Sequence, residues 1–152
     1  MTIRELEQKS GLERAESIIL PGVGACGDAA KKRKDSGLED TVISLAKAGK
    51  PLMGICLGMQ LLFEKSYEYG EHQGLGLIPG VMADLKEDIP AHLQVPHMGW
   101  TSLQLTEKGK KHPLFNYSNE GDNVYFVHSF YGQDCDESLL APSEYVIPVQ
   151  AS

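Results

Sequence analysis

The chain has 152 residues, of which 41% are hydrophobic and 23% charged, and its formal net charge is −7. These values are ordinary for a globular protein with its own hydrophobic core, and the acidic balance argues against general affinity for nucleic acid or acidic membranes. No apolar run approaches membrane-spanning length, and the polar first residues predict no signal peptide. Three separated cysteines without a Cys-x-x-Cys pair fit a reduced protein better than a disulfide framework or a zinc site. We therefore expect one domain over residues 1–152, cytoplasmic, with no nucleic acid or membrane partner.

In chain order, residues 2–9 form a first helix-like segment, and the β-branched run at 16–20 predicts a short buried strand. The strand leads into residues 21–27, which hold three glycines in seven positions. Such a loop brings its backbone close to a ligand and presents N–H groups to an anion or a developing oxyanion. The alternative is simply a tight connection between a strand and a helix. The loop matches neither the phosphate-binding Gly-x-x-x-x-Gly-Lys-Ser/Thr pattern nor a full Gly-x-Gly-x-x-Gly motif.

Two helices are expected after this loop. The first is capped by Asp28 and runs over residues 29–34, where four basic side chains form a solvated face. The second runs from about 38 to 48 and is ended by Gly49. Strands that alternate with helices predict a parallel sheet covered on both faces. Ligands of such sheets gather at the carboxyl ends of the strands.

Residues 50–63 contain the strongest chemical signal of the chain. A short apolar run ends at Cys56, which lies two positions from Gly54 and two from Gly58, and an apolar helix-forming run follows. This is the strand–turn–helix pattern of a nucleophile elbow, with Cys in the place of Ser. In that geometry the N–H of Leu57 and the start of the helix stabilise a thiolate. The alternative is a buried structural cysteine in a glycine-bearing turn.

The second half of the chain has weaker patterns. Residues 64–74 are polar and predict a surface loop, after which 76–81 return toward the sheet. Residues 101–105 alternate as a half-buried strand does. Trp100 beside a glycine is typical of core or rim packing. Residues 145–150 form a last strand, whose proline marks an edge or an end.

The strongest β pattern is at 123–131, which is rich in β-branched and aromatic residues. His128 interrupts this run. Because burying an unpaired imidazole costs free energy, His128 needs a hydrogen-bond partner or a function. A structural histidine with satisfied hydrogen bonds is the plainer of the two interpretations.

Five segments carry a family resemblance when they are taken together. They are Leu-Pro-Gly-Val-Gly-Ala at 20–25, Gly-Ile-Cys-Leu-Gly-Met-Gln-Leu-Leu-Phe at 54–63, Gly-Leu-Gly-Leu-Ile-Pro-Gly at 74–80, Pro-His-Met-Gly-Trp at 96–100 and Tyr-Phe-Val-His-Ser at 125–129. In order and spacing they resemble the class I (Triad) glutamine amidotransferases, and in particular the glutaminase subunits of imidazole glycerol phosphate synthase. The elbow with Gln60 is specific to the class. The last two segments point to its histidine-biosynthesis branch.

The resemblance implies an α/β fold: a flavodoxin-like three-layer α/β/α arrangement with a mostly parallel sheet, here incomplete at both ends. It also implies that Cys56 attacks the side-chain amide of glutamine, so that glutamate and ammonia form through a thioester. The oxyanion would accept hydrogen bonds from the N–H of Leu57 and from that of Val23 or Gly24. Neither a metal nor an organic cofactor is expected.

Substrate and partner contacts also follow from the resemblance. The partner is the cyclase subunit, a β/α barrel that uses the ammonia to build the imidazole ring, and Tyr125 faces it. The groups that hold glutamine are Gly24, Gln60 and the backbone around His128, Ser129 and Phe130.

The chain departs from the family at both termini. The family's first strand, which precedes the equivalent of Thr2, and its His-Pro-Glu segment have no counterpart, and none of the five histidines is followed by Pro-Glu. His112 is followed by Pro-Leu, and His128 matches a family histidine that is not the general base. We therefore expect the 152 residues alone to hydrolyse glutamine very slowly. The alternative function is a non-catalytic binding module, or a fragment of the family, without the triad His and Glu.

Overall fold

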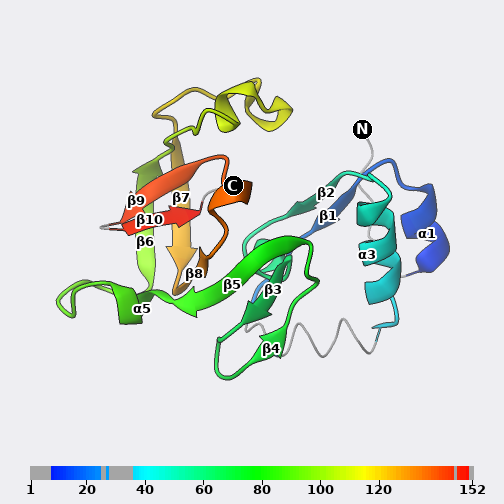
Figure 1. Cartoon of the computed structure of the whole chain (residues 1–152), viewed down its shortest axis with the longest axis horizontal. Coiled ribbons are helices and arrows are strands. Elements are labelled where there is room, and N and C mark those ends of the chain that lie inside the picture. The colour runs from blue at the N-terminus through cyan, green and yellow to red at the C-terminus, as the bar shows by residue number, and fades with distance from the viewer. Residues whose placement is uncertain (1–7, 25–26, 28–35, 146, 151–152) are drawn as a thin grey trace. The chain divides into compact units, whose positions relative to one another are not determined.

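The computed structural model describes residues 8–24, 27, 36–145 and 147–150 (Figure 1). The chain divides into two compact units, Met1–Pro79 and Gly80–Ser152, and each is described by itself below. A single domain over residues 1–152 stays a prediction. Cys26, Asp28 and the expected basic helix at 29–34 lie outside the described residues.

The first unit contains the parallel strand pair that the alternating pattern predicts. Strands β1 (Ile18–Leu20) and β2 (Leu52–Gly54) run parallel, with Ile18 opposite Leu52 and Leu20 opposite Gly54. Both strands have the positions that the sequence indicates. Their carboxyl ends therefore bring the glycine loop and the cysteine turn to the same end of the pair.

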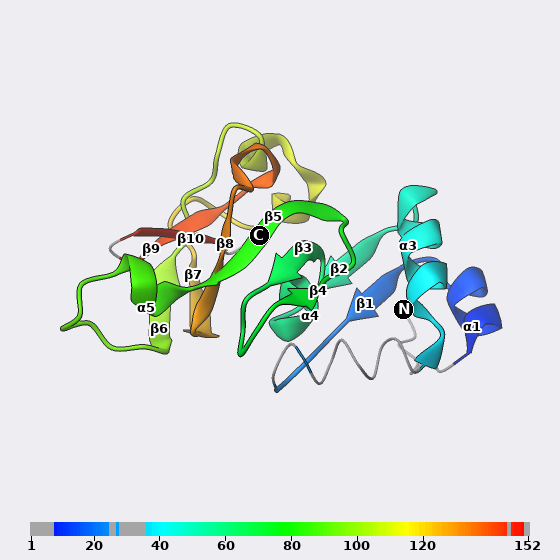
Figure 2. The same cartoon turned by 60° about the horizontal axis from the view of Figure 1, so that its bottom comes forward.

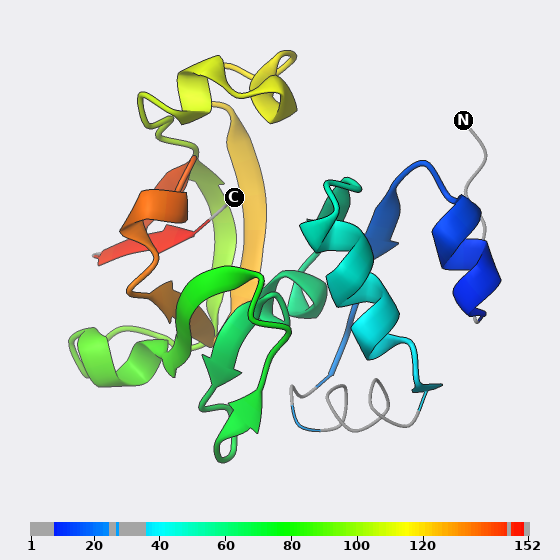
Figure 3. The same ribbon diagram turned by 45° about the vertical axis from the view of Figure 1, so that its right-hand side comes forward.

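Two helices complete this part of the first unit (Figure 3). Helix α3 (Glu39–Lys47) confirms the helix expected near 38–48, and Gly49 follows it with φ +92°, the left-handed conformation that glycine adopts readily after a helix. Helix α1 (Lys9–Arg14) packs against α3 and begins where the first helix-like segment was expected to end. The Lys50 ammonium joins α1 to the start of β2, because Nζ donates to the carbonyls of Leu12, Glu13 and Ala15 at 2.6–2.8 Å.

The segment after the elbow differs from the sequence prediction. Helix α4 (Leu57–Gln60) is a single turn, and strand β3 (Phe63–Ser66) then pairs antiparallel with β4 (His72–Gln73). The helix therefore ends before residue 63, and a hairpin takes the place of the surface loop expected at 64–74. The hairpin is visible in Figure 2. Leu61 and Leu62 are buried, and their carbonyls accept hydrogen bonds from residues beyond the hairpin. Tertiary hydrogen bonding has therefore overridden a local preference for helix.

The second unit is built from antiparallel strands. Strand β6 (His97–Ser102) pairs with β7 (Asn123–His128), while β5 (Ile78–Asp84) pairs with β8 (Phe130–Gln133). The strong β pattern at 123–131 is thus two strands that turn a corner at Ser129. The strand expected at 101–105 begins earlier, at 97, and ends at Ser102.

The second unit also contains a short hairpin and several helical turns. Strands β9 (Pro142–Tyr145) and β10 (Ile147–Gln150) form a hairpin, with β9 beside β6. Helix α5 (Leu85–Asp88) and three 3-10 turns (Gly109–Lys111, Pro113–Phe115 and Asp136–Ser138) connect the strands. The core is a cluster of Leu85, Ile89, Phe126 and Val149.

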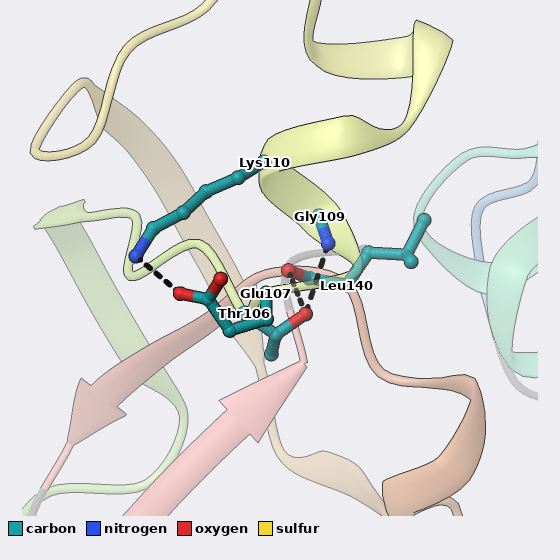
Figure 4. Close-up of polar contacts among 5 residues, drawn as sticks. All are labelled: Thr106, Glu107, Gly109, Lys110 and Leu140. Atoms are coloured by element: carbon teal, nitrogen blue, oxygen red, sulfur yellow. Dashed lines mark hydrogen bonds and ion pairs between the residues drawn. The ribbon is translucent and has the colours of Figure 1, made fainter.

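A polar clasp fixes the turn after β6 (Figure 4). The Thr106 hydroxyl lies 3.0 Å from the carbonyl oxygen of Leu140, to which it donates, and 3.0 Å from the N–H of Gly109, from which it accepts. Lys110 and Glu107 form an exposed ion pair at 2.9 Å beside it. The clasp orders a segment that has few apolar side chains of its own.

The strands mix both directions. Strands β1 and β2 run parallel, while the pairs β3–β4, β5–β8, β6–β7 and β9–β10 are antiparallel. Within the described ranges, no helix is long and apolar enough to cross a membrane.

Candidate active site

Cys56 lies on a sharp turn between β2 and α4, as the elbow pattern predicts. Its backbone has φ 55° and ψ −120°, a conformation that is rare outside glycine. The side chain is exposed. The structure therefore excludes the alternative of a buried structural cysteine and presents the sulfur to solvent at the end of the parallel pair.

The two flanking glycines are required by close backbone contacts. A Cβ at Gly54 would lie 2.6 Å from the backbone nitrogen and Cα of Met59, and one at Gly58 would overlap the carbonyl oxygen of Leu20. Since neither neighbour is a flexible side chain, no rotamer change relieves these overlaps. The glycines thus allow α4 to pack directly on the ends of β1 and β2.

The glycine loop lies against the elbow. A Cβ at Gly22 would be 3.0 Å from the Cβ of Leu57, so the loop touches the first residue of α4. Val23 is 93% exposed, and Gly24 has φ +98° with open space around it. Within the described residues, the backbone N–H groups of Val23, Gly24 and Leu57 have no hydrogen-bond acceptor. This part of the first unit therefore offers free donors near an exposed thiol.

Gln60 is the last residue of α4. It is half-buried, and its N–H lies 3.2 Å from the carbonyl oxygen of Cys56, one helical turn away. Because α4 is only one turn long, its dipole is small, and the thiolate stabilisation expected from a longer helix is correspondingly less. Local N–H groups are the larger electrostatic contribution.

His128 ends β7 in the second unit, next to the corner at Ser129. Its Nδ1 lies 2.9 Å from the carbonyl oxygen of Phe130, and its Nε2 lies 3.0 Å from Nδ1 of His97. The carbonyl oxygen of Ser129 accepts a hydrogen bond from the N–H of Leu85 at 2.9 Å. His128 is therefore the satisfied histidine that the plainer interpretation expected, and both its ring nitrogens are engaged.

His97 is the second histidine of this cluster and was missed by sequence reasoning. It is 4% exposed and stacks on Tyr145, with ring centroids 3.9 Å apart. Burial lowers the pKa of His97, and the neighbouring His128 adds to this effect. Burial also lowers the pKa of His128, although its hydrogen bond to Phe130 opposes the shift. Both rings are therefore neutral at pH 7.

The outer face of β6 and β7 carries an exposed apolar strip, defined here as Met98, Trp100, Tyr125 and Val127. Trp100 lies opposite Tyr125 and Met98 opposite Val127, and each of the four side chains is at least 53% exposed. The interpretation of Trp100 as core or rim packing was wrong, because the residue is 71% exposed. The period-two alternation of 97–102 against 123–128 is the signal that would have placed these side chains on one face.

Metal chemistry has no support in the described part of the chain. No group of three or more His, Cys, Asp or Glu side chains there is arranged to hold a metal ion. The described residues do present an exposed thiol and a hydrogen-bonded pair of histidines, one of them buried.

Comparison with known proteins identifies the class. The family described as glutamine amidotransferase class-I matches residues 2–148, so the chain belongs to that family. A solved structure titled "Crystal structure of glutamine amidotransferase" has the same fold, with a TM-score of 0.66 and 20% identity over 91% of this chain and 66% of that one. The α/β fold class expected from the sequence is confirmed.

Relatives within the class narrow the assignment. The chain is 45% identical over 144 residues to the imidazole glycerol phosphate synthase subunit HisH of Wolinella succinogenes, covering 93% of this chain and 69% of the relative. It is 47% identical over 148 residues to that of Bacillus licheniformis, covering 95% and 68%, and 44% identical over 140 residues to that of Helicobacter hepaticus, covering 92% and 64%. The chain is thus a member of the HisH group of glutaminase subunits and spans about two thirds of the length of these relatives.

Proposed function

We propose that this chain carries the nucleophile of a cytoplasmic glutaminase that releases ammonia from glutamine for a cyclase subunit. The observation that carries the proposal is the exposed Cys56 in a strained backbone conformation, followed by the N–H of Leu57, for which the described residues supply no hydrogen-bond acceptor. Family membership supports it, because the relatives are subunits of imidazole glycerol phosphate synthase.

The thiolate of Cys56 attacks the side-chain amide carbon of glutamine. A C–S bond forms, and the amide oxygen becomes an oxyanion that accepts hydrogen bonds from the N–H of Leu57 and from that of Val23 or Gly24. The intermediate collapses as the nitrogen takes up a proton and leaves as ammonia. Water then attacks the thioester, and glutamate leaves while the sulfur regains its negative charge or a proton.

The substrate contacts follow the same proposal. In the first unit these are Gly24, an open left-handed glycine, and Gln60, a half-buried residue one helical turn from Cys56. The backbone around His128, Ser129 and Phe130 is proposed as a further contact because of the family resemblance.

The exposed apolar strip on β6 and β7 is the proposed contact for the cyclase, a β/α barrel. Tyr125 lies within it, and its ring meets Trp100 edge-on with centroids 5.4 Å apart. Aromatic side chains that are exposed in the free subunit are typical anchors of protein interfaces.

Hydrolysis requires a general base that the 152 residues do not contain in the family's form. Among the histidines, His128 would be the first candidate for this base, but both of its ring nitrogens are hydrogen-bonded, and burial lowers its pKa. We therefore expect these residues to acylate slowly and to release the thioester more slowly still. A non-catalytic glutamine-binding module is the second candidate function, and this engagement of His128 is the observation that favours it.

Ammonia release in the presence of the purified cyclase separates the two candidates. The 152-residue chain is compared with its Cys56→Ser variant and with a version extended through a His-Pro-Glu segment. The glutaminase proposal expects the extended version to release ammonia at least a hundredfold faster than the chain alone, and the Cys56→Ser change to abolish release in both. A Cys56→Ser variant as active as its parent would refute the nucleophile assignment.

A further inference from the structure

A series of hydrogen bonds links strands β6 and β7 and ends where β7 meets β8; Figure 1 shows these strands. Thr101 Oγ1 lies 3.3 Å from Nε2 of His97, and Nδ1 of His97 lies 3.0 Å from Nε2 of His128. Nδ1 of His128 then lies 2.9 Å from the carbonyl oxygen of Phe130. The two histidines are direct cross-strand partners, so the β6–β7 register itself creates the contact.

The carbonyl of Phe130, at the end of this series of hydrogen bonds, determines which ring nitrogens carry a hydrogen. The Phe130 carbonyl only accepts, so Nδ1 of His128 carries the hydrogen and donates. Because His128 is neutral, its Nε2 has a lone pair and must accept from Nδ1–H of His97. Nε2 of His97 then accepts from the Thr101 hydroxyl. One tautomer of each ring satisfies all three contacts.

Packing holds His97 in this orientation. Its ring stacks on those of Tyr145 and Phe126, at centroid distances of 3.9 and 5.3 Å and interplanar angles of 15° and 22°. The Tyr145 hydroxyl itself donates to the carbonyl of Gln94 at 2.8 Å. A buried ring with two stacked aromatic neighbours cannot turn easily, so it holds a fixed position against His128.

We propose that His97 is a positioning residue: its N–H donates to Nε2 of His128 and fixes the orientation of that ring, which in turn holds the Phe130 carbonyl at the corner. The inference rests on the proposed function, in which the backbone around residues 128–130 holds glutamine. His97 acts through His128 and does not touch the substrate. A buried imidazole is costly compared with an apolar side chain of similar size, and the role of His97 at the corner accounts for the cost.

Three variants of the 152-residue chain test the proposal. His97→Phe keeps a stacking ring but removes the donor, while His97→Gln keeps an N–H that reaches His128. Thr106→Val removes a hydroxyl from the polar clasp in the same unit, away from the histidines, and is the control for a general loss of stability. The probe is 6-diazo-5-oxo-L-norleucine, a glutamine analogue that alkylates thiols, and iodoacetamide is the probe for intrinsic thiol reactivity.

The first measurement is nitrogen NMR of the imidazoles, with the amide signals of Ser129 and Phe130. We expect the wild type to show hydrogen on Nδ1 of both histidines. His97→Phe should shift the Nε2 signal of His128 and the corner amides, His97→Gln should restore the wild-type pattern, and Thr106→Val should leave it unchanged. Unshifted His128 Nε2 and corner amide signals in His97→Phe would overturn the proposal.

The second measurement is the rate of Cys56 labelling against analogue concentration. We expect His97→Phe to raise the half-saturating concentration about tenfold, as loss of one well-placed hydrogen bond does, with the maximal rate and the iodoacetamide rate unchanged. His97→Gln should recover most of this loss. An unchanged half-saturation in His97→Phe overturns the positioning role. If wild-type labelling neither saturates nor is blocked by glutamine, the proposed function fails instead, and the NMR measurement alone decides whether His97 positions the corner.

Discussion

Replacing Gly58 by alanine tests whether the elbow depends on backbone contact. The added Cβ would overlap the carbonyl oxygen of Leu20 and lie 2.7 Å from its carbonyl carbon. That oxygen accepts a hydrogen bond from Ile55 at 3.0 Å, so relief of the overlap must separate β1 from the turn. Overpacking costs about 1–3 kcal/mol, and the broken hydrogen bond adds about 1 kcal/mol.

We therefore expect Gly58→Ala to lower the free energy of unfolding by about 2–4 kcal/mol, or the midpoint of thermal unfolding by about 5–15 °C. Gly49→Ala is the matched control, because its φ is +92° but no atom lies within 4 Å of the added Cβ. The control should cost only about 1 kcal/mol, the strain of a left-handed backbone. Calorimetry or urea unfolding measures both. A Gly58→Ala loss no larger than that of the control would refute the close-contact explanation.

Three other predictions follow from single contacts. Lys50→Met removes three hydrogen bonds to carbonyls at the end of α1 and should lower the protection of α1 from hydrogen exchange by about 1.5–3 kcal/mol. Lys47→Met, at the exposed end of α3, is the control and should leave this protection unchanged; equal effects would contradict the role of Lys50. The pKa values of His97 and His128 are lowered in the folded state, so their contribution to stability is present above pH 6.5 and is lost as pH falls below it. In urea unfolding from pH 7.5 to 5, His97→Phe should therefore lose less stability than the wild type. An equal loss in the two proteins would contradict this prediction. Limiting iodoacetamide should label Cys56 before Cys135, because Cys135 is buried and its pKa is raised by burial and by neighbouring aspartates. Peptide mapping gives the order of labelling, and the reverse order would count against the elbow.

The cysteine turn and the glycine loop were predictable because each is specified by residues that are close together in the sequence. A cysteine between two glycines requires a sharp turn, and the three-glycine loop after a β-branched strand needs no distant partner to be recognised. The same local reasoning failed after Gln60, where Leu61 and Leu62 favour helix by propensity. Their N–H groups still donate to Leu57 and Met59, but their carbonyls accept hydrogen bonds from residues more than ten positions away, which the sequence of the segment alone does not reveal.

The histidine pair and the exposed strip were missed for a related reason. Each depends on the register between β6 and β7, which sets His97 against His128 and Trp100 against Tyr125. Alternation within one strand shows which residues share a face, but not which residue of another strand lies opposite. A register shift of one position would bury Trp100 and expose His97.

The most direct test of the account is covalent capture of the proposed nucleophile by a glutamine analogue. The 152-residue chain is incubated with 6-diazo-5-oxo-L-norleucine, with and without excess L-glutamine, and the adduct is located by mass spectrometry of the intact chain and its peptides. The account predicts one adduct, on Cys56, whose formation saturates with analogue and is slowed by L-glutamine but not by D-glutamine. Labelling spread over several cysteines, or labelling of Cys56 that L-glutamine does not slow, would contradict it.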